Sequence, residues 1–436
     1  MVRSATKLVT VAAALVVLAV SPAEAASPSE AASPAAGNPL QPGARLYVNP
    51  HSTTVAAAHH LRGPATPGSP KADARLLSHY PTATWFTGGT PRKVHEDVAK
   101  VVRGARKDGS VPVLVAYNVA NRDCGQYSAG GAQSTTEYEA WIDGFAAGIG
   151  DAPTAVILEP DGLGLIPNYV SPIDGTSNCS IPGVDPNDRF AQLGYAIDTL
   201  KKNPRTAVYL DATHTGWQNV GESAQRLLRA GVQRADGFFL NVSNYQFTAN
   251  LVAYGTWISS CIALAERDRA ADPAAYDFGA TCGNQYWNGG PATTWDGAAM
   301  DTTQVWRSEP YSGVHDDLAW NTVGVDSRYA AMLGSTRPTT HFVIDTSRNG
   351  QGPWTGTLDW CNPPGRGLGL RPTTTTGNPL VDAYLWVKVP GESDGQCDRS
   401  GTGADPEWGG IVDPPAGAWF PAQAHQLIAL ANPTLP

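Results

Sequence analysis

The sequence predicts an α/β fold and, within that class, a distorted, partly open (β/α) barrel of about seven parallel strands. The first observation is a set of short runs that are apolar throughout, as expected for strands buried on both faces of a parallel sheet. The second is that amphipathic helical patterns separate these runs. The third is the repeat count: strand followed by helix recurs about seven times, which favours a barrel over an open sheet.

The expected strands share one pattern, a β-branched or aromatic run that ends in polar residues and Gly or Pro. They lie at residues 111–125, 154–162, 206–217, 237–245, 341–350 and 383–395, with two earlier candidates at 44–50 and 82–88. Helices are expected at residues 93–109, 136–150, 188–203 and 222–231. Residues 243–340 interrupt this rhythm, and we interpret them as a long functional loop excursion stapled by a disulfide.

The N-terminal region has the composition of a targeting segment. Residues 1–25 combine two basic residues, an apolar run too short to span a membrane, and a small-residue cleavage site, so we expect a signal peptide. Residues 26–43 are rich in Ala, Ser and Pro and are expected to form a linker. The main folded domain is expected at residues 44–436, in a secreted, extracellular protein with no membrane span.

Charge and cysteine content restrict the function further. The formal net charge is −9 and the basic residues are scattered, which argues against nucleic acid as a partner. Six cysteines after a signal indicate three disulfides, for which fifteen connectivities exist, and pairing sequence neighbours is the simplest. A zinc site is the competing interpretation, but no C-x-x-C or H-E-x-x-H spacing supports it. We therefore expect no metal, no cofactor and a monomer.

Acidic and polar residues follow almost every expected strand. Because carboxyl ends of parallel strands meet on one rim of a barrel, these residues are expected to converge there. They are Asp123, Glu159, Asp161, Asp211, His214, Asn241, Asp345, Glu392 and Asp394. Helix capping explains one such acid but not acids at five strand ends. Paired carboxyls of this kind suit glycoside hydrolysis, in which one protonated carboxyl donates to the leaving oxygen and a second carboxylate activates water or attacks.

Six motifs occur in order along the chain: "VAYNVANRDCGQYSAGG", "VILEPDGL", "YLDATHTGW", "WCNPPGRGLGLRPT", "WVKVPGESDG" and "AGAWFPAQAHQLIALANP". They resemble motifs of glycoside hydrolase family 6, the inverting cellulases, and the first two resemble its signature motifs. The resemblance covers the chain from about Leu46 to the C-terminus. It implies cleavage of β-1,4-glucosidic bonds in cellulose and cello-oligosaccharides with inversion of configuration.

The resemblance also implies roles for individual residues. Asp161 is expected to be the general acid, Asp394 the proposed base, and Asp123 the residue that modulates the acid and places water. Tyr117 is expected to assist distortion of the sugar. The remaining expected substrate-binding residues are Trp85, Asp211, His214, Trp217, Asn241, Trp360, Lys388 and Glu392. The family pattern also supports the pairs Cys124–Cys179 and Cys361–Cys397, while Cys261–Cys282 is expected from the pairing of sequence neighbours.

Some alternatives stay open from the residues alone. Glu159, which precedes a proline, is interpreted as a turn residue, and Asp211 and His214 could equally be a buried structural pair. Ala129 replaces a serine that the family uses in a water relay, and Ser128 is the candidate substitute. Thr213 and Thr215 stand where Gly and Ala are usual.

The mode of action also has competing interpretations. The long segments after Asn241 and Asp394 favour a covered tunnel and cellobiohydrolase action at the non-reducing end. The alternatives are an endo-β-1,4-glucanase with an open cleft, a retaining glycosidase, and a catalytically silent glucan-binding protein.

Overall fold

The computed structural model describes residue 34 and residues 37–125, 128–173, 175–271, 276–284 and 322–436. Its seven strands form one sheet in the order β1 to β7, and every neighbouring pair is parallel. The strands are β1 (Thr84–Phe86), β2 (Val113–Ala116), β3 (Thr154–Leu158), β4 (Thr206–Asp211), β5 (Gly237–Leu240), β6 (His341–Asp345) and β7 (Val381–Leu385). The expected signal peptide, and most of the expected linker, lie outside the described residues.

The sheet curls until its two edge strands approach each other without forming a ladder between them. Just before β1, the Ala83 N–H donates to the Trp386 carbonyl beyond β7 at 3.0 Å. The Trp85 indole N–H donates to the Val387 carbonyl at 2.8 Å across the same seam. The fold is therefore a distorted, partly open (β/α) barrel of seven parallel strands, which confirms the predicted fold class.

Ten α-helices and three 3-10 turns lie within the described residues. The helices are α1 (Thr53–His60), α2 (Pro70–Leu77), α3 (Pro91–Asp108), α4 (Thr135–Ile149), α5 (Pro186–Leu200), α6 (Val220–Ala230), α7 (Thr248–Ala271), α8 (Phe278–Thr281), α9 (Thr322–Leu333) and α10 (Pro421–Ala429). The 3-10 turns are η1 (Asp123–Gly125), η2 (Val232–Arg234) and η3 (Pro406–Trp408).

Local sequence explains where these helices begin and end. Thr90, Ser134 and Asn219 each precede a helix, and their side-chain oxygens accept a backbone N–H from its first turn. Gly109 and Gly231 end α3 and α6 in the left-handed conformation, which glycine adopts without steric cost. The four helices predicted from periodicity are therefore present, with bounds shifted by a few residues.

Two predictions about elements need correction. The candidate strand at residues 44–50 makes only one bridge, between Leu46 and Val111, because the chain turns at Pro50, which lacks an N–H, and enters α1. The region from residue 243 to 340 is not only a loop excursion. It contains α7, α8 and α9, so β5 and β6 are also joined through helices, and residues 285–321 lie outside the described residues.

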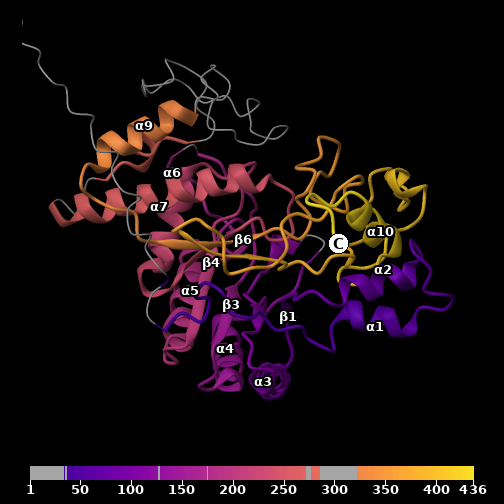
Figure 1. Cartoon of the computed structure of the whole chain (residues 1–436). Helices are drawn as coiled ribbons and strands as arrows, with labels where there is room; N and C mark the ends of the chain where they lie inside the picture. The colour runs from indigo at the N-terminus through magenta and orange to yellow at the C-terminus, as the bar shows by residue number, and fades with distance from the viewer. Residues whose placement is uncertain (1–33, 35–36, 126–127, 174, 272–275, 285–321) are drawn as a thin grey trace, which may run out of the picture. The chain divides into compact units, whose positions relative to one another are not determined.

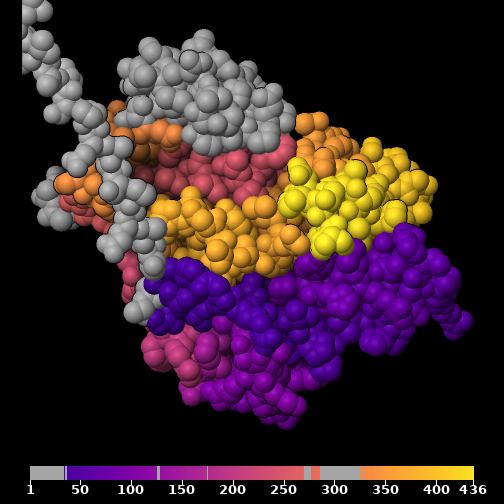
Figure 2. Space-filling view, viewed as in Figure 1, coloured from indigo at the N-terminus to yellow at the C-terminus, as the bar shows by residue number. Residues whose placement is uncertain are grey.

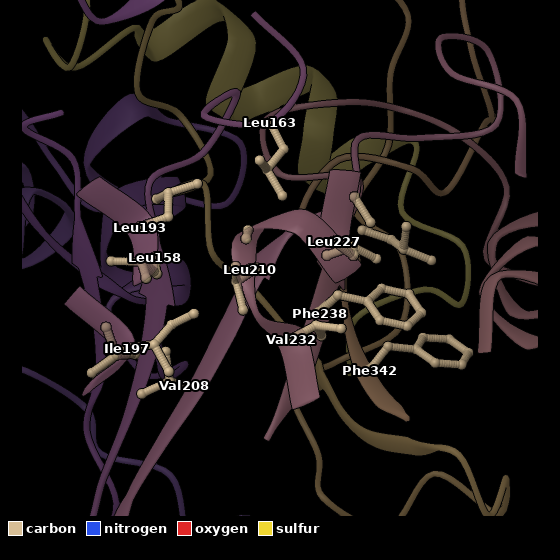
Figure 3. Packing of buried hydrophobic residues seen from close by; sticks show 14 of the residues in the cluster. Leu158, Leu163, Leu193, Ile197, Val208, Leu210, Leu227, Val232, Phe238 and Phe342 are labelled. Carbon is tan, nitrogen blue, oxygen red and sulfur yellow. The ribbon is translucent and has the colours of Figure 1, made fainter. Parts of the chain in front are cut away.

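Apolar side chains fill both faces of the sheet. Inside the barrel, Val115, Ile157, Tyr209, Phe239 and Val343 are fully buried. A larger cluster lies between the outer face of the sheet and the surrounding helices. Figure 3 shows part of it, with the labelled residues Leu158, Leu163, Leu193, Ile197, Val208, Leu210, Leu227, Val232, Phe238 and Phe342. Alternation along each strand thus supplies one core inside and another outside.

The two ends of the folded chain pack against each other. The C-terminal helix α10 lies beside α2, and the His425 imidazole contacts the Asp73 carboxylate at 2.9 Å (Figures 1 and 2). At the amino ends of the strands, Asn38 and Leu40 are buried although they lie within the segment expected to be linker. No described helix has the length and apolar character needed to cross a bilayer.

Candidate active site

A cleft of about 710 Å³ crosses the carboxyl ends of the strands. Its lining includes every residue predicted for the site except Asp211 and Asn241. The predicted residues that line it are Trp85, Tyr117, Asp123, Asp161, His214, Trp217, Trp360, Lys388, Glu392 and Asp394. These residues come from β1, from the segments that follow β2, β3, β4 and β7, and from the segment between β6 and β7, so the barrel rather than any single motif assembles the site.

Asp161 lies just beyond β3, at a residue with φ of 62°, and its carboxyl group faces the cleft. No described residue donates a hydrogen bond to that carboxyl. Burial in the surrounding protein raises its pKa well above the usual value, and the nearby charges of Asp211, Asp123 and Asp394 raise it further. Asp161 is therefore placed to keep a proton at a pH where ordinary carboxyls have lost theirs.

Asp123 lies on the neighbouring loop beyond β2 and is half-buried. The Ser128 N–H donates to its Oδ2 at 2.8 Å. Burial raises its pKa, while this hydrogen bond and the Arg122 charge oppose the increase. Ser128 and Ala129 both line the cleft beside Asp123, so a serine hydroxyl is available one residue before the position where the family has one.

Asp394 has the opposite environment. Its Oδ2 accepts hydrogen bonds from Arg348 Nη1 at 2.8 Å, from the Asn362 N–H at 3.0 Å and from the Tyr245 hydroxyl at 3.1 Å. Lys388 Nζ lies 3.1 Å from its Oδ1. Burial alone would raise its pKa, but the Arg348 and Lys388 charges outweigh burial and lower the pKa to about 2. Asp394 is thus a fixed negative charge opposite a carboxyl that retains its proton.

Sequence reasoning missed several residues that hold these acids. Arg348 and Tyr245 contact Asp394, and the guanidinium of Arg348 also lies 4.5 Å from the centre of the Tyr245 ring. Arg122 donates from Nε to the Ser128 carbonyl at 2.9 Å, and its guanidinium lies 4.4 Å from the centre of the Tyr117 ring. Their position in the sequence could have identified both arginines, because they lie in polar stretches directly after strands.

Asp211 and Asn241 do not line the cleft. Asp211 is buried below the loop that carries Asp161, where its Oδ2 accepts the Gly164 N–H at 2.9 Å and the Leu163 N–H at 3.2 Å. Burial raises the pKa of Asp211 to about 6. Asn241 donates to the Asp345 carbonyl at 2.8 Å and accepts the Gln246 N–H at 3.0 Å. Both side chains hold backbone in place rather than facing the cleft.

Aromatic rings line the cleft on several sides. The Trp85 ring meets the Tyr117 ring edge-on, with centroids 5.5 Å apart. Trp217 lies beside His214, with ring centroids 5.8 Å apart, and Trp360 contributes a further indole. Flat apolar rings next to a few polar groups suit a ligand with apolar faces and hydroxyl-bearing edges, as a pyranose has.

Disulfides hold the loops that carry the acids. Cys124–Cys179 anchors the residue after Asp123, and Cys361–Cys397 joins the segment before Asn362 to the loop after Asp394. The third bridge, Cys261–Cys282, joins α7 to the residue that follows α8. The three bridges therefore link neighbouring cysteines in the sequence, and two of them restrict loops of the cleft.

A barrel with a cleft across its strand ends, lined by unlike carboxyls and aromatic rings, has the arrangement of a glycoside hydrolase. The family model for glycosyl hydrolases family 6 matches residues 41–431. Because this match covers nearly the whole chain, the protein belongs to glycosyl hydrolase family 6.

Individual relatives carry the names of two kinds of cellulase. Endoglucanase 1 of Streptomyces halstedii is 33% identical over 368 residues, which is 84% of this chain and 84% of that protein. Endoglucanase A of Thermobispora bispora is 32% identical over 80% of this chain, which spans 58% of that longer protein. A probable 1,4-beta-D-glucan cellobiohydrolase C of Neosartorya fischeri is 27% identical over 92% of the chain and 80% of that protein.

A similar solved structure is that of the endoglucanase Cel6 from Mycobacterium tuberculosis in complex with a methyl-cellobiosyl-thio-cellobioside. It is 31% identical, has a TM-score of 0.62, and covers 91% of this chain and 99% of its own.

Proposed function

We propose that this protein hydrolyses β-1,4-glucosidic bonds of cellulose and cello-oligosaccharides with inversion of configuration. The observation that carries the proposal is the contrast between two carboxyls in one cleft. Asp161 has no hydrogen-bond donor among the described residues and a strongly raised pKa, whereas Asp394 is ion-paired and has a pKa of about 2. One carboxyl can therefore give a proton while the other stays charged, as glycoside hydrolysis requires.

In the proposed mechanism, Asp161 donates its proton to the glycosidic oxygen as the bond to the anomeric carbon breaks. Positive charge develops on the sugar ring, and water attacks from the opposite face. Asp394 is too weak a base to deprotonate water in the ground state. Attacking water becomes strongly acidic as its bond to carbon forms, so Asp394 takes up the proton late, either directly or through a water beside Asp123. Burial keeps the pKa of Asp161 high, and the charges of Asp211 and Asp123 add to it.

The other cleft residues have proposed binding roles. Tyr117 is proposed to assist sugar distortion, while Lys388 and Glu392 hold the sugar before the scissile bond. The side chains proposed to stack on sugar rings are Trp85, Trp217 and Trp360. Asp211 and His214 are proposed to support the part of the cleft that carries Asp161, and Asn241 the part that carries Asp394.

Two observations favour cleavage within the chain over cleavage at chain ends. The loop after Asp394 folds on itself, since the Asp405 N–H donates to the Ile411 carbonyl at 2.7 Å. At the end of this loop, only Ala416 and Gly417 line the cleft. The relatives with at least 30% identity described above are named endoglucanases. Cellobiohydrolase action stays the second candidate, because the excursion after Asn241 is long and one of the relatives is named a probable cellobiohydrolase.

Secretion forms part of the proposal. The expected signal peptide and the three disulfides both suit an oxidising extracellular environment. The proposed partner is a β-1,4-glucan chain bound by a single copy of the protein.

Product analysis tests these proposals. The purified protein is incubated with cellohexaose, and proton NMR follows the first products; α-anomers are expected for inversion, and β-anomers would indicate retention. Viscosity and released sugar are then measured with carboxymethyl cellulose. A rapid fall in viscosity is expected for internal cleavage, whereas cellobiose release with nearly constant viscosity would indicate chain-end cleavage. Binding of cello-oligosaccharides without any sugar release would identify a silent glucan-binding protein.

A further inference from the structure

Two loops carry the acid and its modulator, and they leave the sheet side by side. The acid loop comprises residues 159–165, after β3, and the Asp123 loop comprises residues 117–123, after β2. The ladder between β2 and β3 ends at Ala116 and Leu158, with one more backbone bond from the Glu159 N–H to the Ala116 carbonyl at 2.8 Å. Beyond this point no strand pairing sets the distance between the loops.

Beyond the last backbone hydrogen bond of the ladder, the Glu159 side chain connects the two loops. Its Oε2 accepts the N–H groups of Asn118 at 2.8 Å and Val119 at 2.9 Å. Glu159 is completely buried, and its φ of 53° turns the side chain away from the cleft towards the neighbouring loop. A non-glycine residue persists in this conformation only where its surroundings compensate for the strain. Two charge-assisted hydrogen bonds provide such compensation.

Arg189 joins the same two loops from the first turn of α5. Its Nη1 donates to the Gly162 carbonyl at 2.6 Å in the acid loop, and its Nη2 donates to the Ala120 carbonyl at 2.9 Å in the Asp123 loop. Arg189 is 3% exposed, and its charge lies close enough to Glu159 to stabilise the carboxylate. The two side chains therefore contact both loops through buried, oppositely charged groups.

We propose that Glu159 and Arg189 form a buried clamp that fixes the Asp123 loop against the acid loop and so sets the separation of Asp123 from Asp161. Both are positioning residues, because neither lines the cleft. The role rests on the proposed function, in which Asp123 helps Asp161 to hold its proton. Loosening the clamp moves the Asp123 charge away from Asp161, so the pKa of Asp161 falls and less of the acid is protonated near neutral pH.

Two substitutions that remove opposite charges distinguish a positioning role of these residues from a purely electrostatic one. Above about pH 7, where burial no longer keeps Glu159 protonated, Glu159→Gln removes a negative charge, whereas Arg189→Gln removes a positive charge at any pH. If these residues act on Asp161 only through their own charges, the two variants shift its pKa in opposite directions. If they act by holding the loops, both variants lower it.

The matched control is Asp236→Asn. The carboxylate of Asp236 is also buried, accepts the Val208 N–H at 2.9 Å and pairs with Lys201 at 2.6 Å, but it lies at the amino end of the sheet. The control is expected to lower the melting temperature while leaving the pKa of Asp161 and the pH profile unchanged.

Two measurements are made on the folded variants and the wild type. Carboxyl-carbon NMR titration reports the pKa of Asp161 directly, and the pH dependence of kcat/KM on cellohexaose reports the basic limb. Both clamp variants are expected to lower the Asp161 pKa and shift the basic limb towards lower pH, with kcat reduced by about 10- to 100-fold from misplacement of the acid. Opposite shifts, or variants that behave like Asp236→Asn, would overturn the clamp. A wild type that cleaves no β-1,4-glucan would overturn the proposed function instead, while the NMR titration still decides the clamp.

Discussion

Asp382 at the amino end of the sheet and Asp161 at its carboxyl end are two buried carboxyl groups with very different partners. At the amino end, Asp382 contacts the His341 imidazole at 2.7 Å and accepts hydrogen bonds from the Tyr209 hydroxyl at 2.5 Å and the Asn38 amide at 3.2 Å. At the carboxyl end, Asp161 has no donor among the described residues. A buried carboxylate with a complete set of partners stabilises the fold, whereas one without them holds a proton that it can transfer.

Asp161→Asn tests the carboxyl end most severely. The amide keeps the volume of the side chain but has no acidic proton, so kcat on cellohexaose is expected to fall by about 10³-fold. Affinity for cellotetraose, measured by calorimetry, should change little, because the aromatic lining of the cleft is intact. A variant that retains wild-type turnover would refute the acid assignment.

Asp394→Asn is expected to affect activity and stability together. It leaves the buried Arg348 and Lys388 without their shared counter-charge, which is expected to cost about 3 kcal/mol of unfolding free energy. The kcat should fall by about 10²-fold or more. Urea denaturation and single-turnover assays measure the two effects, and appreciable residual turnover in folded protein would indicate that water is activated through Asp123.

Asp382→Asn sharpens the comparison from the amino end. Loss of the carboxylate that contacts His341 and accepts from Tyr209 is expected to reduce the unfolding free energy by about 2 kcal/mol. The kcat of the folded fraction should remain at the wild-type value, since the opposite end of the sheet carries the cleft. Denaturation midpoint and active-site-normalised rate are compared, and a selective loss of kcat would show that the two ends are coupled.

The smallest expected effect concerns Glu159 and pH. Burial raises the pKa of Glu159 from 4.5 to about 7, so the folded state binds this proton more tightly than the unfolded state. The resulting stabilisation is complete below about pH 4.5 and is lost as pH rises through about 7. Glu159→Gln removes this term, so its unfolding free energy should change less between about pH 5 and about pH 7.5 than that of the wild type. Identical pH dependence would mean that Glu159 is ionised throughout.

The same contrast explains which residues sequence reasoning could place. Asp161, Asp211 and Asp394 follow or end predicted strands, and this position predicted that they lie on one rim, because parallel strands share a direction. The sequence pattern could not predict that Asp211 hydrogen-bonds the backbone of the acid loop while Asp161 faces the cleft. Arg348 was missed for a related reason, since its importance lies in contact with Asp394, which follows a different strand.

The sequence by itself determined the α/β barrel, four of its helices, and the acids that reach the carboxyl end. Periodicity, caps and strand-end residues are local properties that neighbouring residues encode. Only the tertiary structure decided how the acids differ. Asp161 and Glu159 lie two residues apart, yet one faces the cleft without a donor and the other holds the next loop. Their pKa values and roles depend on burial and on partners contributed by distant strands, and these exist only once the barrel has closed.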